Sequence, residues 1–419
     1  MTSFDGHAGD PLRVALVYRH FNLQGSLQRY HVELARYLVG AGHEVHVYSV
    51  PATRDGSLVP GAVHHDVPVL TISGDRVGPA AELASFAWRA TRAIRLDFVP
   101  FDAVHARAPS VGKCHILHLP GVVGGELRRH RATRSEAGLV RDLKDLVLPV
   151  VRPMTTVRLG LERQALRGSA LVEVHVDSEL VRSDLLESYP ELRVPVQIVS
   201  PGVNLEEFRP TSDRRAVREA LGLPQDTHLI LFCGHDFGRK GLDRAILALA
   251  RMRETADLVV VGGGEREPYL RLEREARLQG RVHYAGARKD AWRFYQAADV
   301  VALPTRVDMW GTSVVEAMAS GVPPVTTAAA GAAAVVDESV GIVLPDPLSL
   351  DAFAEALDRL VGDEQLRRRL GAAARERASS LTWIEHGRAV EQALHRVRNA
   401  RLEAGRKKLP SEPDPALKP

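Results

Sequence analysis

The segment 304–324 carries two acidic residues and a glycine whose types and spacing suit a ligand rich in hydroxyl and phosphate groups. Asp308 and Glu316 stand eight positions apart, on either side of Gly311. We expect Asp308 in a loop, where its carboxylate can accept sugar hydroxyl groups. We expect Glu316 within the following helix, where its carboxylate can accept both hydroxyl groups of a ribose. Two solvated acids flanking a helix start explain the same residues equally well.

The start of that helix offers a second kind of contact. The first turn of a helix leaves backbone N–H groups without partners inside the helix, and such groups bind phosphate oxygens. The amides that we expect to be free for this purpose belong to Gly311, Thr312, Ser313 and Val314. Hydroxyl acceptors and phosphate donors would then lie within one short segment.

A basic loop lies in the segment 233–242. It contains Gly234 and Gly238 and ends in Arg239 and Lys240, directly before an expected helix. Backbone donors of such a loop, together with two cations, can hold a diphosphate. The residue order of a Walker A loop, G-x-x-x-x-G-K-[ST], is absent. The alternative is an exposed basic helix start that binds no ligand.

Two further loops are rich in small residues. Gly25 and Ser26 lie between an expected strand and its helix, where small residues let backbone N–H groups approach an anion. A tight turn is the simpler explanation for them. Three glycines at 262–264 end another expected strand. Ligands of doubly wound sheets bind outside the carboxyl ends of strands, although an ordinary strand-to-helix turn explains these glycines equally well.

Short apolar runs alternate with helical segments along the chain, a pattern typical of parallel α/β proteins. The strands and helices of this pattern must position the residues named above. We expect strands at 13–18, 44–50, 67–72, 102–106, 171–176 and 196–200, and a second series at 228–233, 257–261, 282–284, 300–303 and 324–327. Two consecutive series of similar size predict two doubly wound domains.

The turn residues at 201–211 mark the expected domain boundary. We therefore predict an N-terminal domain over 1–200 and a C-terminal domain over 201–384. A C-terminal helix over 385–400 is expected to pack back on the first domain. The charged, proline-rich residues 401–419 are expected to be a disordered tail.

The composition excludes several classes of protein. The 419 residues carry a net charge of +3 from 55 basic and 52 acidic residues, which is too balanced for a generic nucleic-acid binder. No window is long and apolar enough for a membrane-spanning helix, and the N-terminus resembles no targeting signal. Cys114 and Cys233 match no metal-ligand spacing, and no Asp-x-Asp pair occurs to hold a metal. We expect a cytoplasmic protein.

One stretch departs from this balance of charge. Residues 126–167 contain ten basic and five acidic residues, together with a series of leucines and valines. A basic amphipathic segment of this kind can lie on an anionic membrane, which would place the protein peripherally at the inner face of the cytoplasmic membrane. A solvated helix face packed by its apolar side is an equal alternative.

These segments jointly resemble family 4 of the retaining glycosyltransferases, which have the GT-B architecture. The donor-site pattern of that family is an acid, two residues, glycine, four residues, Glu-Ala and Gly-x-Pro. The matching residues are Gly311, Glu316, Ala317, Gly321 and Pro323. Segments 201–210, 237–241, 25–26 and 42–45 resemble the family's interdomain turn, lysine phosphate loop, N-terminal glycine loop and second strand. The resemblance runs from about residue 13 to residue 397 and is nearest to the lipopolysaccharide core glucosyltransferases.

The resemblance implies two Rossmann-like domains that face a central cleft, with acceptor binding by 1–200 and nucleotide-sugar binding by 201–384. It also implies roles for individual residues. Lys240, with Arg239, would neutralise the donor diphosphate. Glu316 would hold the donor ribose, and the amides of 311–314 would face the distal phosphate or the sugar. Gly25 and Ser26 would approach the phosphate from the opposite domain.

Three positions bear on donor choice and catalysis. Asp308 replaces the family's usual glutamate, which moves the carboxylate by about one bond length and so alters hydrogen-bond distances to a donor sugar. His235 stands where many members carry arginine. His118 is the candidate for the family's N-terminal-domain histidine, and with Asp308 and Lys240 it completes the predicted catalytic set. A partly buried structural histidine explains His118 equally well.

The implied activity is transfer of a hexose from a nucleotide-diphosphate sugar, with a UDP-sugar favoured. The acceptor would be a hydroxyl group of a glycan or glycolipid in cell-envelope polysaccharide or lipopolysaccharide synthesis. The reaction would retain the anomeric configuration and need no metal or other cofactor. A sugar-nucleotide epimerase and a non-catalytic nucleotide-sugar-binding subunit are the alternatives with the same architecture.

Overall fold

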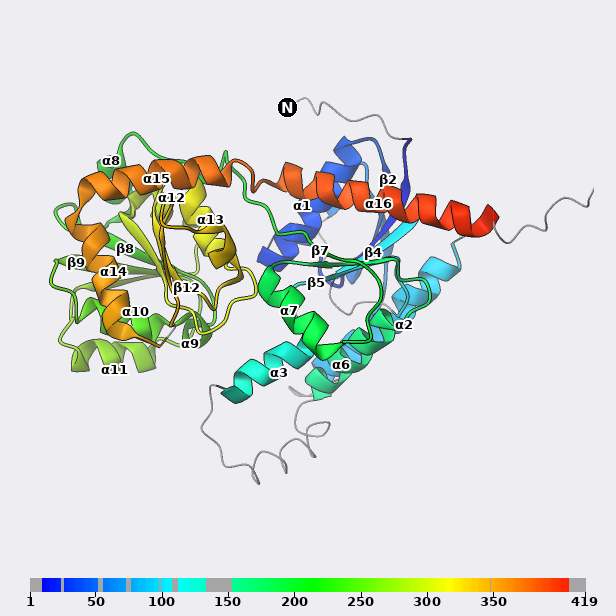
Figure 1. Ribbon diagram of the computed structural model, residues 1–419, viewed down its shortest axis with the longest axis horizontal. Coiled ribbons are helices and arrows are strands. Elements are labelled where there is room, and N and C mark those ends of the chain that lie inside the picture. The colour runs from blue at the N-terminus through cyan, green and yellow to red at the C-terminus, as the bar shows by residue number, and fades with distance from the viewer. Residues whose placement is uncertain are drawn as a thin grey trace, which may run out of the picture. The chain divides into compact units, whose positions relative to one another are not determined.

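Two parallel β-sheets organise the chain in the computed structural model (Figure 1). The structure describes residues 10–23, 26–51, 56–72, 77–97, 99–107, 112–132, 153–346 and 348–406. The first unit combines the chain up to Val176 with Asp184–Val199 and with the residues from His386 onward. The second unit combines Asp177–Ser183 with Ser200–Glu385.

The sheet of the first unit has the strand order β3-β2-β1-β4-β5-β6-β7, and all its neighbours are parallel. Its strands are β1 (Arg13–Val17), β2 (Glu44–Ser49), β3 (Val63–Asp66), β4 (Ala103–Arg107), β5 (Ile116–Leu119), β6 (Glu173–Val176) and β7 (Val196–Ile198). The helices of this part of the chain are α1 (Ser26–Gly40), α2 (Gly78–Arg95), α3 (Val123–Ala132), α6 (Pro153–Leu166), α7 (Glu179–Ser188) and α16 (Trp383–Arg406).

The sheet of the second unit has the order β10-β9-β8-β11-β12-β13, again with parallel neighbours. Its strands are β8 (His228–Cys233), β9 (Ala256–Val261), β10 (Val282–Gly286), β11 (Val300–Leu303), β12 (Pro324–Thr327) and β13 (Ile342–Leu344). Its helices are α8 (Arg214–Leu221), α9 (Phe237–Lys240), α10 (Leu242–Leu249), α11 (Glu267–Glu275), α12 (Ala291–Ala297), α13 (Thr312–Ala319), α14 (Leu350–Gly362) and α15 (Glu364–Ala378).

Strand β8 is apolar at consecutive positions because helices cover both faces of its sheet. Ile230 and Phe232 belong to a buried cluster with residues of α10 and α14. Leu229 and Leu231 belong to a second cluster, which includes residues of α12, α13 and α15. Successive side chains of a strand point to opposite faces, so one apolar run supplies both cores. This arrangement is the predicted doubly wound sheet.

The structure corrects one strand prediction and adds two strands that were not predicted. The predicted strand at 67–72 is wrong, because β3 lies at Val63–Asp66 and Leu70 and Ile72 are exposed. β3 is an edge strand with a polar, partly exposed sequence, so it lacks the apolar pattern of a buried strand. The apolar run at 67–72 that follows it was predicted to be the strand instead. β5 and β13 were not predicted. β5 carries a histidine inside an otherwise apolar run, and β13 is short and only half-buried.

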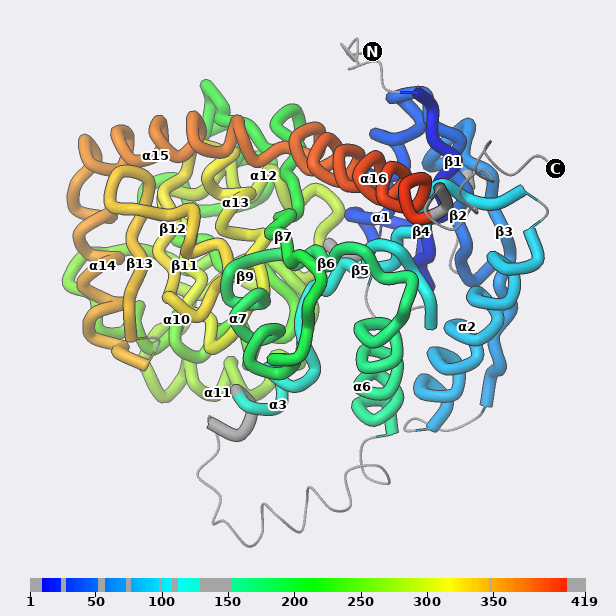
Figure 2. Tube along the Cα trace, turned by 45° about the vertical axis from the view of Figure 1, so that its right-hand side comes forward, coloured from blue at the N-terminus to red at the C-terminus, as the bar shows by residue number. Residues whose placement is uncertain are grey.

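The helix α16 extends further than expected and belongs to the first unit from His386 onward. It lies along that unit in both views (Figures 1 and 2), where Tyr37 donates a hydrogen bond to Glu391 at 2.7 Å and Arg396 pairs with Glu173 at 2.8 Å. The predicted tail boundary at residue 401 is wrong, because the helix continues to Arg406. Arg401 anchors its end by donating to the carbonyl of Phe101 at 2.6 Å. Residues 407–419 lie outside the described part of the chain.

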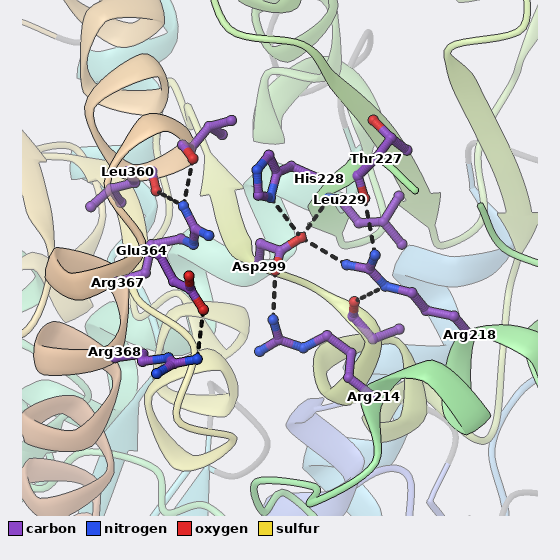
Figure 3. A network of polar contacts seen from close by, with 12 residues as sticks. Arg214, Arg218, Thr227, His228, Leu229, Asp299, Leu360, Glu364, Arg367 and Arg368 are labelled. Carbon is purple, nitrogen blue, oxygen red and sulfur yellow. Dashed lines mark hydrogen bonds and ion pairs between the residues drawn. The ribbon is translucent and has the colours of Figure 1, made fainter. Parts of the chain in front are cut away.

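A buried carboxylate joins α8 to the centre of the second sheet (Figure 3). Asp299, directly before β11, pairs with Arg218 at 2.7 Å and with Arg214 at 2.5 Å, and it accepts the backbone amide of Leu229 at 2.8 Å. Arg218 also donates to the carbonyl of Thr227 at 2.9 Å. Only 7% and 6% of the side chains of Arg218 and Asp299 are exposed, so both charges are largely shielded from water.

Replacing Asp299 by alanine should destabilise the protein by about 3–5 kcal/mol, because the substitution leaves Arg218 buried without its counter-charge. The free energy of unfolding in urea measures the effect. Arg368→Ala is the matched control, since the ion pair between Arg368 and Glu364 is largely exposed and should contribute at most about 0.5 kcal/mol. Equal losses for the two variants would contradict the assignment.

Acid should remove the same contribution to stability. Burial alone would raise the pKa of Asp299, but Arg214, the Leu229 amide and Arg218 outweigh burial and lower it. The stabilisation is therefore complete above about pH 4, the ordinary carboxyl range, and is lost as the pH falls through the folded-state pKa. The unfolding free energies of the wild type and Asp299→Asn should converge at acid pH, and parallel curves would show that ionisation of Asp299 contributes nothing.

Candidate functional site

The carboxyl ends of β8 and β11 lie side by side in the second sheet, at the point where successive strands begin to be added in the opposite direction. From β8 the sheet continues through β9 and β10, and from β11 it continues through β12 and β13. Ligands of doubly wound sheets bind at such a switch point. The loop after β8 carries Arg239 and Lys240, and the loop after β11 carries Asp308. The topology therefore brings together three residues that the sequence singled out separately.

A glycine fixes the direction of Lys240. Lys240 is the last residue of α9, and Gly241 both ends α9 and begins α10, with φ of +83°. A Cβ at this position would lie 2.1 Å from the carbonyl oxygen of Pro304. Only glycine therefore allows the loop after β8 to lie against the loop after β11.

Lys240 and Asp308 bind each other. Lys240 Nζ donates to Asp308 Oδ2, and both side chains are 11% exposed. The aliphatic part of Lys240 lies on Gly234, where an added Cβ would be 3.4 Å from its carbons. Arg239 Nη1 lies 3.8 Å from Asp308 Oδ1 and 2.9 Å from the carbonyl oxygen of Val307, to which it donates. Two cations thus face one carboxylate, an ion pair that the sequence pattern did not predict.

The backbone of the Asp308 loop is held on two sides. The amide of Asp308 donates to the carbonyl of Ala329 at 2.9 Å, and its own carbonyl accepts the amide of Gly331 at 2.8 Å. The hydroxyl of Ser178 donates to the carbonyl of Met309 at 2.6 Å. The position of the Asp308 carboxylate therefore rests on segments far away in the sequence.

The start of α13 agrees only in part with the prediction. Gly311 caps the helix with φ of +97°, a conformation that favours glycine. The amide of Val314 donates to the carbonyl of Gly311 at 2.9 Å, so the expectation that all amides of 311–314 are free is wrong for Val314. The helix closes its first turn one residue earlier than expected. The hydroxyl of Ser313 is buried and has no hydrogen-bond partner among the described residues.

Glu316 lies inside α13, half-buried, as the sequence predicted. Tyr295 of α12 donates its hydroxyl to Glu316 Oε2 at 2.6 Å. Burial, with further contributions from Cys233 and Glu316, raises the pKa of Tyr295 well above its ordinary value, so the hydroxyl keeps its proton. The sequence pattern gave no signal for this partner, because an aromatic residue in an amphipathic helix indicates only core packing.

His235 is exposed in the loop after β8. Its Nδ1 accepts the amide of Gly263 at 3.2 Å, which links this loop to the glycine run after β9. Gly262 allows a close approach between the two loops, since its Cβ position lies 1.9 Å from the carbonyl oxygen of Gly234. His235 thus joins the same edge of the second sheet as Lys240.

The remaining predicted site residues belong to the first unit. His118 is on β5, has no exposed surface, and contacts the hydroxyl of Tyr30 through Nδ1 at 2.9 Å. Burial lowers the pKa of His118 well below its ordinary value. Ser26 is the first residue of α1, and Gly25 lies outside the described residues.

The basic stretch 126–167 is described only at its two ends, because residues 133–152 lie outside the described ranges. Arg158 of α6 makes two hydrogen bonds to Glu126 of α3, at 2.8 and 2.9 Å. Arg128 pairs with Glu187 at 3.1 Å. Some of the basic residues are therefore engaged within the protein. Among the described residues, no helix has the length and apolar content needed to cross a membrane.

Comparison with known proteins shows which family the chain resembles. Residues 213–377 match the model of a family described as "Glycosyl transferases group 1". Over 385 residues the chain is 30% identical to a D-inositol 3-phosphate glycosyltransferase of Xylanimonas cellulosilytica, an alignment that covers 86% of this chain and 89% of that protein.

Solved structures support the fold. WaaG, a glycosyltransferase involved in lipopolysaccharide biosynthesis, has a TM-score of 0.73 at 23% identity, with 92% of this chain and 99% of that chain covered. HepE of Anabaena, in complex with UDP-glucose, has a TM-score of 0.68 at 17% identity, with the same coverage. Two Rossmann-like parallel sheets and these neighbours confirm the predicted GT-B fold class.

The match extends through both units, and the segment that matches the family model contains Lys240, Asp308 and Glu316. The predicted resemblance to glycosyltransferases is therefore confirmed at the level of the family, whereas the similarity to the lipopolysaccharide subgroup stays a prediction. The chain belongs to the group 1 glycosyl transferases.

Proposed function

We propose that this glycosyltransferase moves a hexose from a UDP-sugar to a hydroxyl group of a polyol or glycan acceptor, with retention at the anomeric carbon. The observation that carries the proposal is the ion pair of Lys240 and Asp308 at the switch point of the second sheet, with Glu316 eight residues after Asp308. Each of these three side chains suits a different part of a nucleotide sugar.

Lys240 and Arg239 bind the donor diphosphate. The bond that breaks joins the anomeric carbon to a phosphate oxygen, so negative charge grows on the leaving diphosphate. Cations placed there stabilise the transition state more than the ground state. Lys240 is the principal contact, because its nitrogen lies at the switch point and its stem is fixed on Gly234.

Asp308 changes partner when the donor binds. Without a donor it neutralises Lys240, as the ion pair records. A diphosphate supplies that neutralisation instead and repels the carboxylate, which then accepts hydroxyl groups of the sugar. The leaving phosphate accepts the proton of the attacking hydroxyl, so no carboxylate nucleophile is needed. The reaction requires no metal in this scheme, as the family resemblance implies.

Glu316 binds the ribose hydroxyl groups. Tyr295 holds one carboxylate oxygen by a hydrogen bond of 2.6 Å, which orients the group on α13. The choice of uridine rests on HepE, a protein of the same fold that binds UDP-glucose. His235 and the amides of Thr312 and Ser313 are the proposed additional contacts to the phosphates and the sugar.

The first unit binds the acceptor. The relatives of this chain named D-inositol 3-phosphate glycosyltransferases make that polyol phosphate the first acceptor to test. Arg19 follows β1 at the switch point of the first sheet, where a cation suits a phosphorylated acceptor. The resemblance to the lipopolysaccharide core enzymes makes a core oligosaccharide the second acceptor to test.

Incubation with UDP-glucose or GDP-glucose, with each acceptor and without any, tests this function. We expect an α-linked product from UDP-glucose by NMR, and slow donor hydrolysis when the acceptor is left out. Formation of an epimer of the donor would show a sugar-nucleotide epimerase instead. Donor binding without turnover under every condition would show a non-catalytic subunit.

Lys240→Ala should lower kcat/KM for the donor by about 10²–10³-fold, because one cation facing the leaving group is lost. Steady-state donor hydrolysis or transfer measures the change. Arg253→Ala is the matched control. The side chain of this arginine is 84% exposed, and it lies before the amino end of β9, whereas Lys240 lies beyond the carboxyl ends of the strands. Unchanged kinetics of Lys240→Ala would refute the phosphate contact.

Glu316→Gln should raise KM for the UDP-sugar about 10-fold and change kcat little, because a charged hydrogen-bond acceptor of the ribose is lost from ground and transition state alike. Kinetics with a 2′-deoxyribose donor supply the control. The wild type should already have a raised KM for that donor, and Glu316→Gln should raise this KM little further. An equally large loss with both donors would argue against the ribose contact.

A further inference from the structure

The helix that ends in Lys240 is short and needs support from other segments. α9 has four residues, so its last carbonyl groups require hydrogen-bond donors from outside the helix. Its first residue, Phe237, packs in the core of the second unit and is 4% exposed. Gly238, by contrast, borders a cavity of about 360 Å³, so this side of α9 is less closely packed. Polar contacts therefore contribute to fixing the end of α9 that carries Lys240.

Arg306, in the loop after β11, supplies the missing donors. Its backbone amide donates to the carbonyl of Arg239 at 3.0 Å, and its Nη1 donates to the carbonyl of Gly238 at 2.7 Å. The hydroxyl of Thr305 donates to the same Arg239 carbonyl at 3.1 Å. Arginine side chains can bind the last carbonyl groups of a helix in this way. Arg306 thus caps α9 with both its main chain and its side chain.

The same guanidinium binds Asp243 in the first turn of α10. Nη1 and Nη2 of Arg306 lie 2.9 and 2.7 Å from the two carboxylate oxygens of Asp243. The planar fork of an arginine suits a carboxylate in this geometry, and a lysine cannot make the same set of contacts. The two side chains are 31% and 32% exposed, so water partly screens their charges. The main effect of the contact is therefore geometric, since it joins the loop after β11 to both α9 and α10.

We propose that Arg306 is a positioning residue for sugar transfer and acts through Lys240. This inference rests on the proposed function, in which Lys240 binds the donor diphosphate. Arg306 holds the residues on both sides of Lys240 against the loop that carries Asp308. The ammonium group therefore stays where the leaving phosphate gains charge, and a misplacement of about 1 Å at such a site can lower a rate about 100-fold. The rival explanation is that Arg306 is one more cation near the diphosphate.

Donor kinetics of Arg306→Ala test the proposal. We expect kcat per folded molecule to fall about 10–100-fold with a smaller rise in KM, because the lost contact orients a group that acts mainly in the transition state. The measurement is made well below the Tm of the variant. Arg251→Ala is the matched control and should behave as the wild type, since Arg251 follows the last turn of α10 and pairs with Asp351 at 3.0 Å. Unchanged kinetics of Arg306→Ala would overturn the proposal.

A double variant shows whether Arg306 acts through the lysine. Adding Arg306→Ala to Lys240→Ala should lower kcat/KM by no more than about 2-fold, because no lysine remains to be positioned. Losses that multiply would overturn the proposal, since they would show independent action. If Lys240→Ala alone leaves the kinetics unchanged, the phosphate contact of the proposed function fails, and the role of Arg306 fails with it. An impaired Lys240→Ala beside a normal Arg306→Ala refutes the role of Arg306 alone.

Two milder variants decide between the explanations if Arg306→Ala does not fold. Asp243→Asn weakens the hold on the guanidinium and should lower kcat about 3–10-fold. If Arg306 were only a further cation, loss of the carboxylate beside it would raise kcat/KM instead. Arg306→Lys keeps the charge but loses the fork, and it should lower kcat at least about 5-fold. Activity of either variant at or above that of the wild type would overturn the proposal.

Discussion

The ion pair between Lys240 and Asp308 is the interaction on which the second unit's ligand site depends. Charges so nearly buried persist only as partners, because each alone would lose its hydration without compensation. The pair forms because β8 and β11 are neighbours, although 68 positions separate the two residues. It holds the two loops together, and in the proposed function a diphosphate takes over the counter-charge that Asp308 supplies.

Local sequence signals pointed to most residues of this candidate site, since they lie in or beside short segments with glycine. The spacing of Asp308 and Glu316 and the adjacent cations at 239–240 are such signals. The contacts that orient these groups come from elsewhere: Tyr295 holds Glu316, and Ser178 supports the Asp308 loop. Neither has a recognisable pattern, because each contact exists only after distant helices have packed.

The fold itself was predictable wherever strands are buried on both faces and read as apolar runs, as in β8 and β11. The prediction failed where a strand is polar or where a polar residue is buried within it. β3 is a polar edge strand, and β5 contains His118 at a fully buried position. In sequence, His105, His118 and His175 are isolated polar residues within apolar strands. Only parallel pairing places their rings together, so this cluster has no signature in any single segment.

Gly241 has a consequence for how this enzyme can diverge. One residue ends α9, begins α10 and leaves room for the Pro304 carbonyl, so no residue separates Lys240 and this glycine from the helix that follows. An inserted or deleted residue between 234 and 244 would rotate Lys240 away from the loop after β11. Working descendants of this chain can therefore vary in side chains across that stretch, but alignments of them should contain no gaps there.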